Sequence, residues 1–171
     1  MAAAGLLILR VAIGGILFGH GAQKVFGWWG GPGLAGWTQA MTRMRIRPPR
    51  AWALISAFGE LVGGILLALG LLTPFACAAI ASSMLVAIAL VHWPRGFWVS
   101  KGGYEFNISI LGATAALALI GPGSTSLDAA LRFHFPEPTT LIAVTVAMLG
   151  GASATLLSRG PAPVPAKTET A

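Results

Sequence analysis

The sequence predicts an all-α protein, a polytopic bundle of helices that crosses a membrane several times. Hydrophobic residues make up 56% of the 171 residues and charged residues only 9%, whereas a soluble domain carries about 25% charged residues. The mean hydropathy is +0.78. This composition excludes intrinsic disorder and leaves too few charges to cover a soluble globule. The apolar runs are continuous rather than alternating, which favours membrane helices over barrel strands.

The first two of five predicted spans carry charges inside their apolar runs. A helix needs roughly 20 apolar residues to cross the hydrocarbon core, and residues 4–26 and 51–71 meet this length. Three polar side chains interrupt the first segment: Arg10, His20 and Lys24. Glu60 is the only charge in the second. A signal peptide is the alternative for the first segment, but its early charge lies within the apolar run and no A-x-A site follows.

The other three predicted spans are less interrupted. Residues 74–92 contain no Asp, Glu, Lys or Arg and begin with Pro74, which a helix start tolerates because its missing N–H has no helical partner there. Residues 104–121 carry Glu105 near their start, and residues 139–158 carry no charge.

Three regions follow from these spans. Residues 1–132 form the predicted core of four transmembrane helices, and residues 133–158 supply an additional transmembrane helix. Residues 159–171 are rich in Pro and Ala and are predicted to form a disordered cytoplasmic tail.

The basic residues predict the orientation of the bundle. With five spans, nine Lys and Arg residues fall on one side of the membrane and only Arg132 on the other. Cytoplasmic loops carry the excess of Lys and Arg, so we expect the N-terminus outside and the C-terminus in the cytoplasm. All six tryptophans fall on the basic side, as in an interfacial aromatic belt. The nine basic residues are Lys24, Arg43, Arg45, Arg47, Arg50, Arg95, Lys101, Arg159 and Lys167.

Arg10 and Glu60 are the two opposite charges in the central part of the predicted spans. A charge near mid-bilayer costs roughly 3 kcal/mol, so such a residue needs a partner or a cavity. Arg10 and Glu60 are the first candidates, and two interpretations stay open. They form a structural ion pair between two helices, or Glu60 carries a proton or Arg10 binds an anionic substrate.

A second polar cluster is predicted nearer the cytoplasm, where three spans end or begin. The cluster suits a quinone headgroup or a small anion. The alternatives are a metal site, although the spacing is not diagnostic, and simple interfacial placement of long side chains. We expect His20, Lys24 and Glu105 to line one pocket, with Trp28 or Trp29 at its mouth. The cluster comprises His20, Gln23, Lys24, His92, Lys101, Tyr104, Glu105 and Asn107.

Other chemistry has no visible motif in the sequence. Cys77 is the single cysteine, which excludes an intrachain disulfide and a cysteine-built metal site. No P-loop, GxGxxG, HExxH or nucleophile elbow occurs, and no haem or flavin ligand set is apparent. Nucleic acid is not an expected partner, because the basic residues are spread over loops.

Four motifs in order resemble the DoxX family. They are the run HGAQKVFGWWGGPG at residues 20–33, Glu60 with Gly63-Gly64, Gly102-Gly103-Tyr104-Glu105, and Gly121-Pro122-Gly123 with Ser126-Leu127-Asp128. The resemblance implies a small bacterial inner-membrane protein with a four-helix core, to which residues 133–158 would be an addition. Its relatives include the small subunit of a thiosulfate:quinone oxidoreductase. Another member is linked to a complex that couples superoxide removal to thiol balance.

The resemblance implies a membrane oxidoreductase subunit that links thiol, sulfur or oxidative-stress chemistry to quinone, with a separate redox partner protein. Under this hypothesis Glu60, His20 and Glu105 are the catalytic candidates, with Arg10 as substrate site or ion-pair partner. The alternative function is a non-enzymatic scaffold or small-solute carrier. The arginine run 43–50 would then contact anionic lipid or a cytosolic partner, unless it is only solvated. The candidate quinone-binding residues are Gln23, Lys24, Trp28 and Tyr104.

Overall fold

The computed structural model describes residues 1–136 and 138–161, and in this range the regular elements are helices. One isolated antiparallel bridge joins Ile46 to Arg159. The predicted all-α fold class is therefore confirmed. Most of the predicted tail, residues 162–171, lies outside the described residues.

Each of the five predicted spans contains a helix, and two additional helices lie between spans. The chain runs through α1 (Ala2–Phe26), α2 (Gly33–Arg43), α3 (Pro49–Leu69), α4 (Thr73–Ala87), α5 (Glu105–Ile120), α6 (Leu127–Ala130) and α7 (Thr139–Leu157). A π-helical turn at Ile88–His92 and a 3₁₀ turn at Trp93–Arg95 continue α4, and further 3₁₀ turns lie at Trp28–Gly30 and Val99–Lys101.

Four of the described helices are long and apolar enough to cross a membrane: Ala2–Phe26, Pro49–Leu69, Thr73–Arg95 and Thr140–Leu157. The fourth predicted span, residues 104–121, contains α5, which is equally apolar but has only 16 residues. At 1.5 Å per residue it is about 24 Å long, which is shorter than the roughly 30 Å of a hydrocarbon core.

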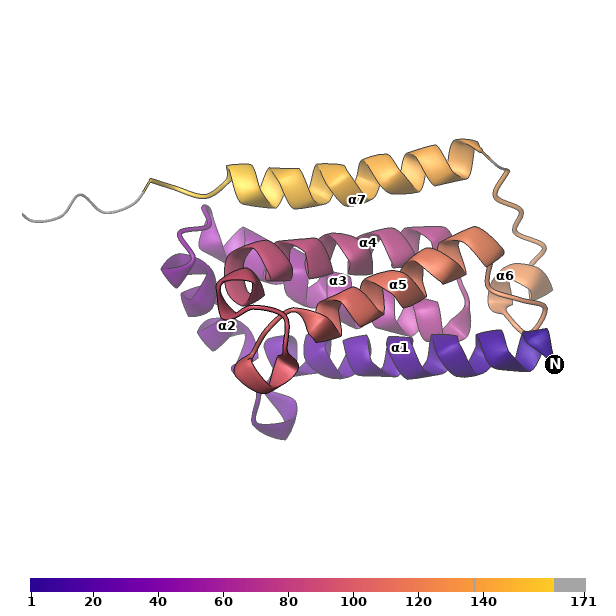
Figure 1. Ribbon diagram of the computed structural model, residues 1–171, viewed down its shortest axis with the longest axis horizontal. Helices are drawn as coiled ribbons and strands as arrows, with labels where there is room; N and C mark the ends of the chain where they lie inside the picture. The colour runs from indigo at the N-terminus through magenta and orange to yellow at the C-terminus, as the bar shows by residue number, and fades with distance from the viewer. Residues whose placement is uncertain (137, 162–171) are drawn as a thin grey trace, which may run out of the picture.

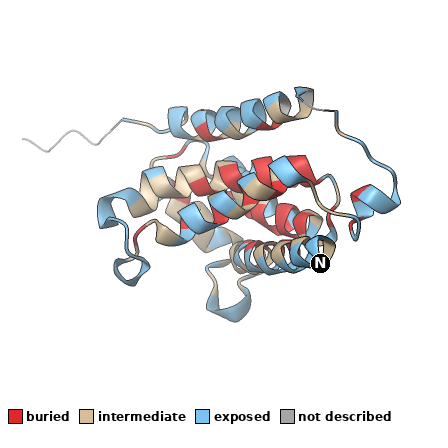
Figure 2. Ribbon diagram, turned by 45° about the vertical axis from the view of Figure 1, so that its right-hand side comes forward, coloured by how far each residue is buried: buried red, intermediate tan, exposed pale blue. Residues whose placement is uncertain are grey.

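The helices form one bundle with distinct ends (Figure 1). Helices α1, α3, α4 and α5 pack together, and α7 lies along the outside of α4. The N-terminus and α6 lie at one end, here called the α6 end. Helix α2 lies at the other, the α2 end. Figure 2 shows the buried positions on the faces that the helices turn toward one another, while α7 remains largely exposed. The largest fully buried apolar side chains of the main core cluster are Leu17, Leu67, Ile80, Ile110 and Leu117.

Glycines set the register of α1 against α3. A Cβ at Gly14 would lie 2.5 Å from the Gly64 carbonyl oxygen, and a Cβ at Gly21 would overlap the backbone of Leu61. Small residues let membrane helices approach this closely. The two helices are antiparallel, because Gly14 lies beside Gly64 whereas Gly21 lies beside Leu61.

The C-terminal end of α7 is fastened to the loop between α2 and α3. The Arg47 backbone N–H donates to the Ser158 carbonyl over 3.0 Å, and the Gly160 N–H donates to the Arg45 carbonyl over 2.8 Å. The end of α7 and the first loop thus lie together at the α2 end, whereas the N-terminus lies at the α6 end. A chain that runs along the bundle an odd number of times begins and ends at opposite ends in this way.

Candidate functional site

An ion pair between the buried Glu60 and the partly buried Lys24 joins α1 to α3 in the half of the bundle nearer the α2 end. The Lys24 ammonium lies 2.6 Å from Glu60 Oε1 and 2.5 Å from Oε2, and the two side chains are 17% and 3% exposed. The Ser83 hydroxyl on α4 donates to Glu60 Oε1 over 2.6 Å. Three helices therefore contribute to one hydrogen-bonded network around a single carboxylate.

The predicted pairing of Arg10 with Glu60 is wrong. Glu60 precedes Leu61 in α3, and Leu61 lies beside Gly21 of α1. Arg10 lies eleven residues before Gly21, about 16 Å away along α1. Helix side chains also lean toward the N-terminus of their own helix. In antiparallel helices this lean brings Lys24 and Glu60 together and directs Arg10 toward the α6 end.

At the α6 end, Arg10 is part of a buried connection between three segments. It is completely buried, and its Nη2 donates to the Thr125 carbonyl over 3.1 Å. The Asp128 carboxylate accepts from the backbone N–H groups of Leu72 over 2.7 Å and Thr73 over 3.0 Å. These bonds tie α1, the α3–α4 turn and the segment around α6 together.

Gly70 makes room for the Arg10 guanidinium. Its φ is 64°, a left-handed conformation that favours glycine, and a Cβ at this position would overlap Arg10. The placement of Arg10 thus depends on the turn that ends α3.

A small pocket of about 50 Å³, here called the pair pocket, adjoins the ion pair. Its polar lining consists of Lys24, Trp37, Ser56, Glu60 and Ser83. The Lys24 ammonium lies 4.4 Å from the centroid of the Trp37 ring, a cation–π contact. The Trp37 indole N–H donates to the Ser56 hydroxyl over 2.8 Å, which holds α2 across this side of the pair.

A larger pocket of about 310 Å³, here called the α3–α7 pocket, lies between α3, α4 and α7. Its lining is mainly apolar, with hydroxyl groups from Ser56, Ser82, Ser83 and Thr155. Ser56 and Ser83 line both pockets. The Ser83 hydroxyl therefore connects the Glu60 carboxylate with the wall of the larger cavity.

Three residues of this site were not among the candidates predicted from the sequence: Trp37, Ser56 and Ser83. A signal for Ser83 was present, because Ser82 and Ser83 are the only hydroxyl-bearing residues in the segment 74–92. Trp37 lies on the amphipathic helix α2, which was not predicted as a separate element. Nothing in the spacing alone placed it over Lys24.

The structure does not bring His20, Lys24 and Glu105 together in one pocket. His20 is exposed on α1, with its ring 5.9 Å from that of Phe106. The Glu105 carboxylate accepts from the Val99 N–H over 2.9 Å. Glu105 thus orders the loop before α5 rather than facing Lys24.

The other members of the second cluster are divided between that loop and the core. His92 Nδ1 lies 2.7 Å from the Gly102 carbonyl, and Tyr104 stacks on Trp93 with 5.3 Å between ring centroids. The buried Asn107 donates to the Met84 sulfur over 3.4 Å. The predicted polar cluster is therefore several local contacts and not a single site.

The residues expected to surround a quinone there are also dispersed. Gln23 packs against the backbone of Gly31. Trp28 and Trp29 are exposed on the turn after α1, and the tryptophan beside Lys24 is Trp37 instead. Within residues 1–136 and 138–161, no three His, Cys, Asp or Glu side chains group closely enough to hold a metal ion.

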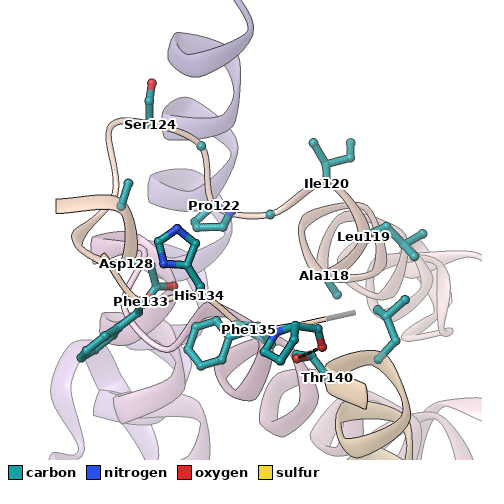
Figure 3. Close-up of a pocket in the computed structure, with 16 residues that line it drawn as sticks. Ala118, Leu119, Ile120, Pro122, Ser124, Asp128, Phe133, His134, Phe135 and Thr140 are labelled. Atoms are coloured by element: carbon teal, nitrogen blue, oxygen red, sulfur yellow. Dashed lines mark hydrogen bonds between the residues drawn. The ribbon is translucent and has the colours of Figure 1, made fainter. Parts of the chain in front are cut away.

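A third pocket, of about 530 Å³, lies at the α6 end. Figure 3 shows His134 and Phe135 from the segment before α7 beside Pro122 and Asp128 in its lining. Both Asp128 carboxylate oxygens already accept backbone hydrogen bonds, and His134 Nδ1 lies 2.8 Å from the Arg132 carbonyl. Asp128 and His134 thus hold the chain in place at this pocket, whereas the Ser83 hydroxyl lines the α3–α7 pocket.

Comparison with known proteins places the ion pair within a shared region. The family model described as DoxX matches residues 5–93, which include Lys24, Glu60 and Ser83. The chain is 33% identical over 124 residues to "Putative oxidoreductase CatD" of Bacillus subtilis (strain 168), covering 72% of this chain and 84% of that protein. It is also 33% identical over 128 residues to "Inner membrane protein YphA" of Escherichia coli (strain K12), covering 72% and 87%. No solved structure matches the chain.

Proposed function

The chain belongs to the DoxX family, and from this premise we propose that it is an inner-membrane subunit of an oxidoreductase that exchanges protons with a membrane quinone. The electrons come from a thiol or sulfur compound through a redox partner protein. The names of the two relatives, a putative oxidoreductase and an inner membrane protein, support the reaction class and the location. The excess of Lys and Arg at the α2 end supports a cytoplasmic placement of that end.

The observation that carries the proposal is the network of Lys24, Glu60 and Ser83 between two pockets. A buried ion pair is a weak source of stability, because desolvation of the two charges offsets most of their attraction. Proton relays in membrane proteins are built from such intramembrane ionisable residues. Here the carboxylate is hydrogen-bonded to a hydroxyl that also lines the α3–α7 pocket.

The α3–α7 pocket fits a quinone headgroup in size and chemistry. Its volume of about 310 Å³ lies at the lower end of the range for small-molecule sites, about 300–1,000 Å³. The apolar walls suit a hydrophobic ring. The Ser82 hydroxyl can donate to a quinone carbonyl oxygen, and the Ser83 hydroxyl can do so when Glu60 is protonated and no longer accepts from it. A bound quinone supplies the two-electron chemistry, with uptake of two protons on reduction.

The residues of this chain would handle the protons. A proton on Glu60 can pass to the Ser83 oxygen while the Ser83 hydroxyl proton is donated into the α3–α7 pocket. Lys24 balances the charge of the Glu60 carboxylate after the transfer, and its ammonium can return a proton. Trp37 and α2 cover this pair from the α2 end, which limits the access of water.

The test is a titration of the full-length chain in lipid nanodiscs with decylubiquinone, followed by quenching of tryptophan fluorescence. Quinol formation is measured with dithiothreitol, a small dithiol that reduces the bound quinone directly and so replaces the thiol compound and the redox partner protein as the electron donor. We expect saturable binding by the wild type. We expect Ser83→Ala to bind the quinone but to form quinol at least about tenfold more slowly, since a positioned proton donor contributes 10²–10⁴-fold.

Ser109→Ala is the matched control, because Ser109 is exposed and its hydroxyl donates to the Glu105 backbone carbonyl. It should behave as the wild type. Wild-type quenching no greater than that of empty nanodiscs would contradict the proposal and favour the scaffold or carrier function. Unchanged quinol formation by folded Ser83→Ala would remove the relay.

A further inference from the structure

A group of arginines gathers where α2, α3 and α7 meet at the α2 end. This group, here called the arginine clip, consists of Arg43, Arg45, Arg47, Arg50 and Arg159. The single ion pair of the described residues is that of Lys24 with Glu60. None of the five guanidinium groups therefore has a carboxylate partner in that part of the chain.

The backbone fixes the position of Arg159 beside the arginines of the first loop. Ile46 and Arg159 form the antiparallel bridge, and hydrogen bonds flank it on both sides, from the Arg47 N–H to Ser158 and from the Gly160 N–H to Arg45. The Arg159 Nε donates to the Met44 carbonyl over 3.2 Å. The Arg47 guanidinium lies against Gly160. Charges far apart in the sequence are thus held together.

The arginine clip lies at the level where two membrane helices end. Helix α3 begins at Pro49 and α7 ends at Leu157, so the loop arginines and Arg159 flank both ends. The Trp52 indole N–H donates to the Arg47 carbonyl over 3.3 Å, and tryptophan is typical of the headgroup level. Just inside the span, the apolar side chains of Ile55 and Leu157 are 59% and 85% exposed.

This arrangement has the two chemical parts of a phospholipid site. Guanidinium groups bind phosphate oxygens through paired N–H donors, and clusters of basic residues beside a membrane helix attract anionic lipids. The exposed apolar side chains above the clip suit acyl chains. A soluble acidic partner would use the charges but not the apolar surface directly beside them.

We propose that the arginine clip binds the phosphate headgroup of an anionic phospholipid in the leaflet that faces the α2 end. The site joins the first loop to the end of α7, so a bound lipid holds α7 against the rest of the bundle. This site is distinct from the Lys24–Glu60 network and does not depend on the proposed redox function.

The test compares phosphatidylglycerol with phosphatidylcholine as ligands of the full-length protein in detergent, with bound lipids counted by native mass spectrometry. We expect the wild type to prefer phosphatidylglycerol. The triple variant Arg45→Gln/Arg47→Gln/Arg159→Gln should lose at least about tenfold of this preference. The Arg159 Nε bond to the Met44 carbonyl is lost in this variant. The two hydrogen bonds that flank the Ile46–Arg159 bridge use main-chain groups and are retained.

A second triple variant, Arg95→Gln/Lys101→Gln/Arg132→Gln, is the control, because it removes the same charge elsewhere and should retain the preference. If both variants lose the preference for phosphatidylglycerol equally, the preference depends only on net charge and the proposed site is wrong. Millimolar inorganic phosphate should not displace the lipid; displacement would assign the clip to free phosphate instead.

If the first triple variant does not fold, the salt dependence of lipid binding by the wild type tests the proposal. Raising the salt from low to about 0.5 M should then reduce phosphatidylglycerol binding several-fold while phosphatidylcholine binding is unchanged, since salt screens such contacts. A wild type with no lipid preference overturns the proposal and leaves a cytosolic acidic partner as the alternative occupant.

Discussion

The coupling between Lys24 and Glu60 can be measured by a double-mutant cycle. The variants are Lys24→Met, Glu60→Leu and the double variant, which remove one charge, the other, or both while keeping apolar volume. The coupling energy is the difference between the double variant and the sum of the two single variants. If Lys24 and Glu60 form an ion pair that contributes to folding, the double variant should lose less unfolding free energy than the sum of the losses of the two single variants.

The magnitude follows from the geometry of the pair. At 2.5 Å and an effective dielectric constant of 20, the attraction of two unit charges is about 6–7 kcal/mol, and desolvation offsets most of it. Removal of Lys24 leaves a carboxylate that is 3% exposed, with Ser83 as its remaining donor among the described residues. We expect this removal to cost about 3–5 kcal/mol.

The two single variants should differ. Lys24 is 17% exposed, lies near the α2 end and keeps its contact with Trp37, so its ammonium can turn toward water when Glu60 is removed. We therefore expect Glu60→Leu to cost less than Lys24→Met, about 1–2 kcal/mol. The double variant should lie close to the wild type.

The assay is reversible unfolding of the purified full-length protein in mixed micelles, with the wild type and three variants under one condition. The matched control repeats the cycle with Arg10→Met in place of Lys24→Met. Because Arg10 lies at the other end of the bundle, its effects should be additive with those of Glu60→Leu. Additive losses in the Lys24 cycle, or strong coupling in the Arg10 cycle, would refute the assignment.

Three further predictions test the packing, the α6 end and the topology. Gly21→Leu should unfold the protein or lower its melting temperature by many degrees, because the side chain would overlap the backbone of α3. Gly15→Leu is the control and should be nearly neutral, since nothing lies within 4 Å of a Cβ there. Thermal melts in detergent compare the two variants. Asp128→Asn should cost about 2 kcal/mol in the free energy of unfolding, because one of two backbone N–H groups loses its charged acceptor. A much smaller change in the free energy of unfolding would show that Asp128 does not hold the α3–α4 turn. Thr42→Cys in a Cys77→Ala background should resist a membrane-impermeant thiol reagent in intact cells; rapid labelling would reverse the proposed orientation.

The sequence by itself determined the helical class and the approximate position of all five apolar helices. Hydropathy is a local property, and a continuous apolar run must satisfy its backbone hydrogen bonds within one helix. The positions of Gly27 and Gly70, with φ of 74° and 64°, also end α1 and α3 close to the predicted boundaries, because glycine adopts this conformation without strain. The four motifs between residues 20 and 128 indicated the family.

The tertiary structure alone decided which charges meet. Position along a span suggested that Arg10 pairs with Glu60, but pairing depends on the register between helices and on the direction in which each side chain leans. The register is set by the close approach of glycines in α1 to the backbone of α3. This contact joins two helices and cannot be read from either segment alone. The same is true of Trp37 over Lys24 and of Arg159 beside Arg47. Each contact joins segments far apart in the chain, and only the packing of the helices defines the distance between them.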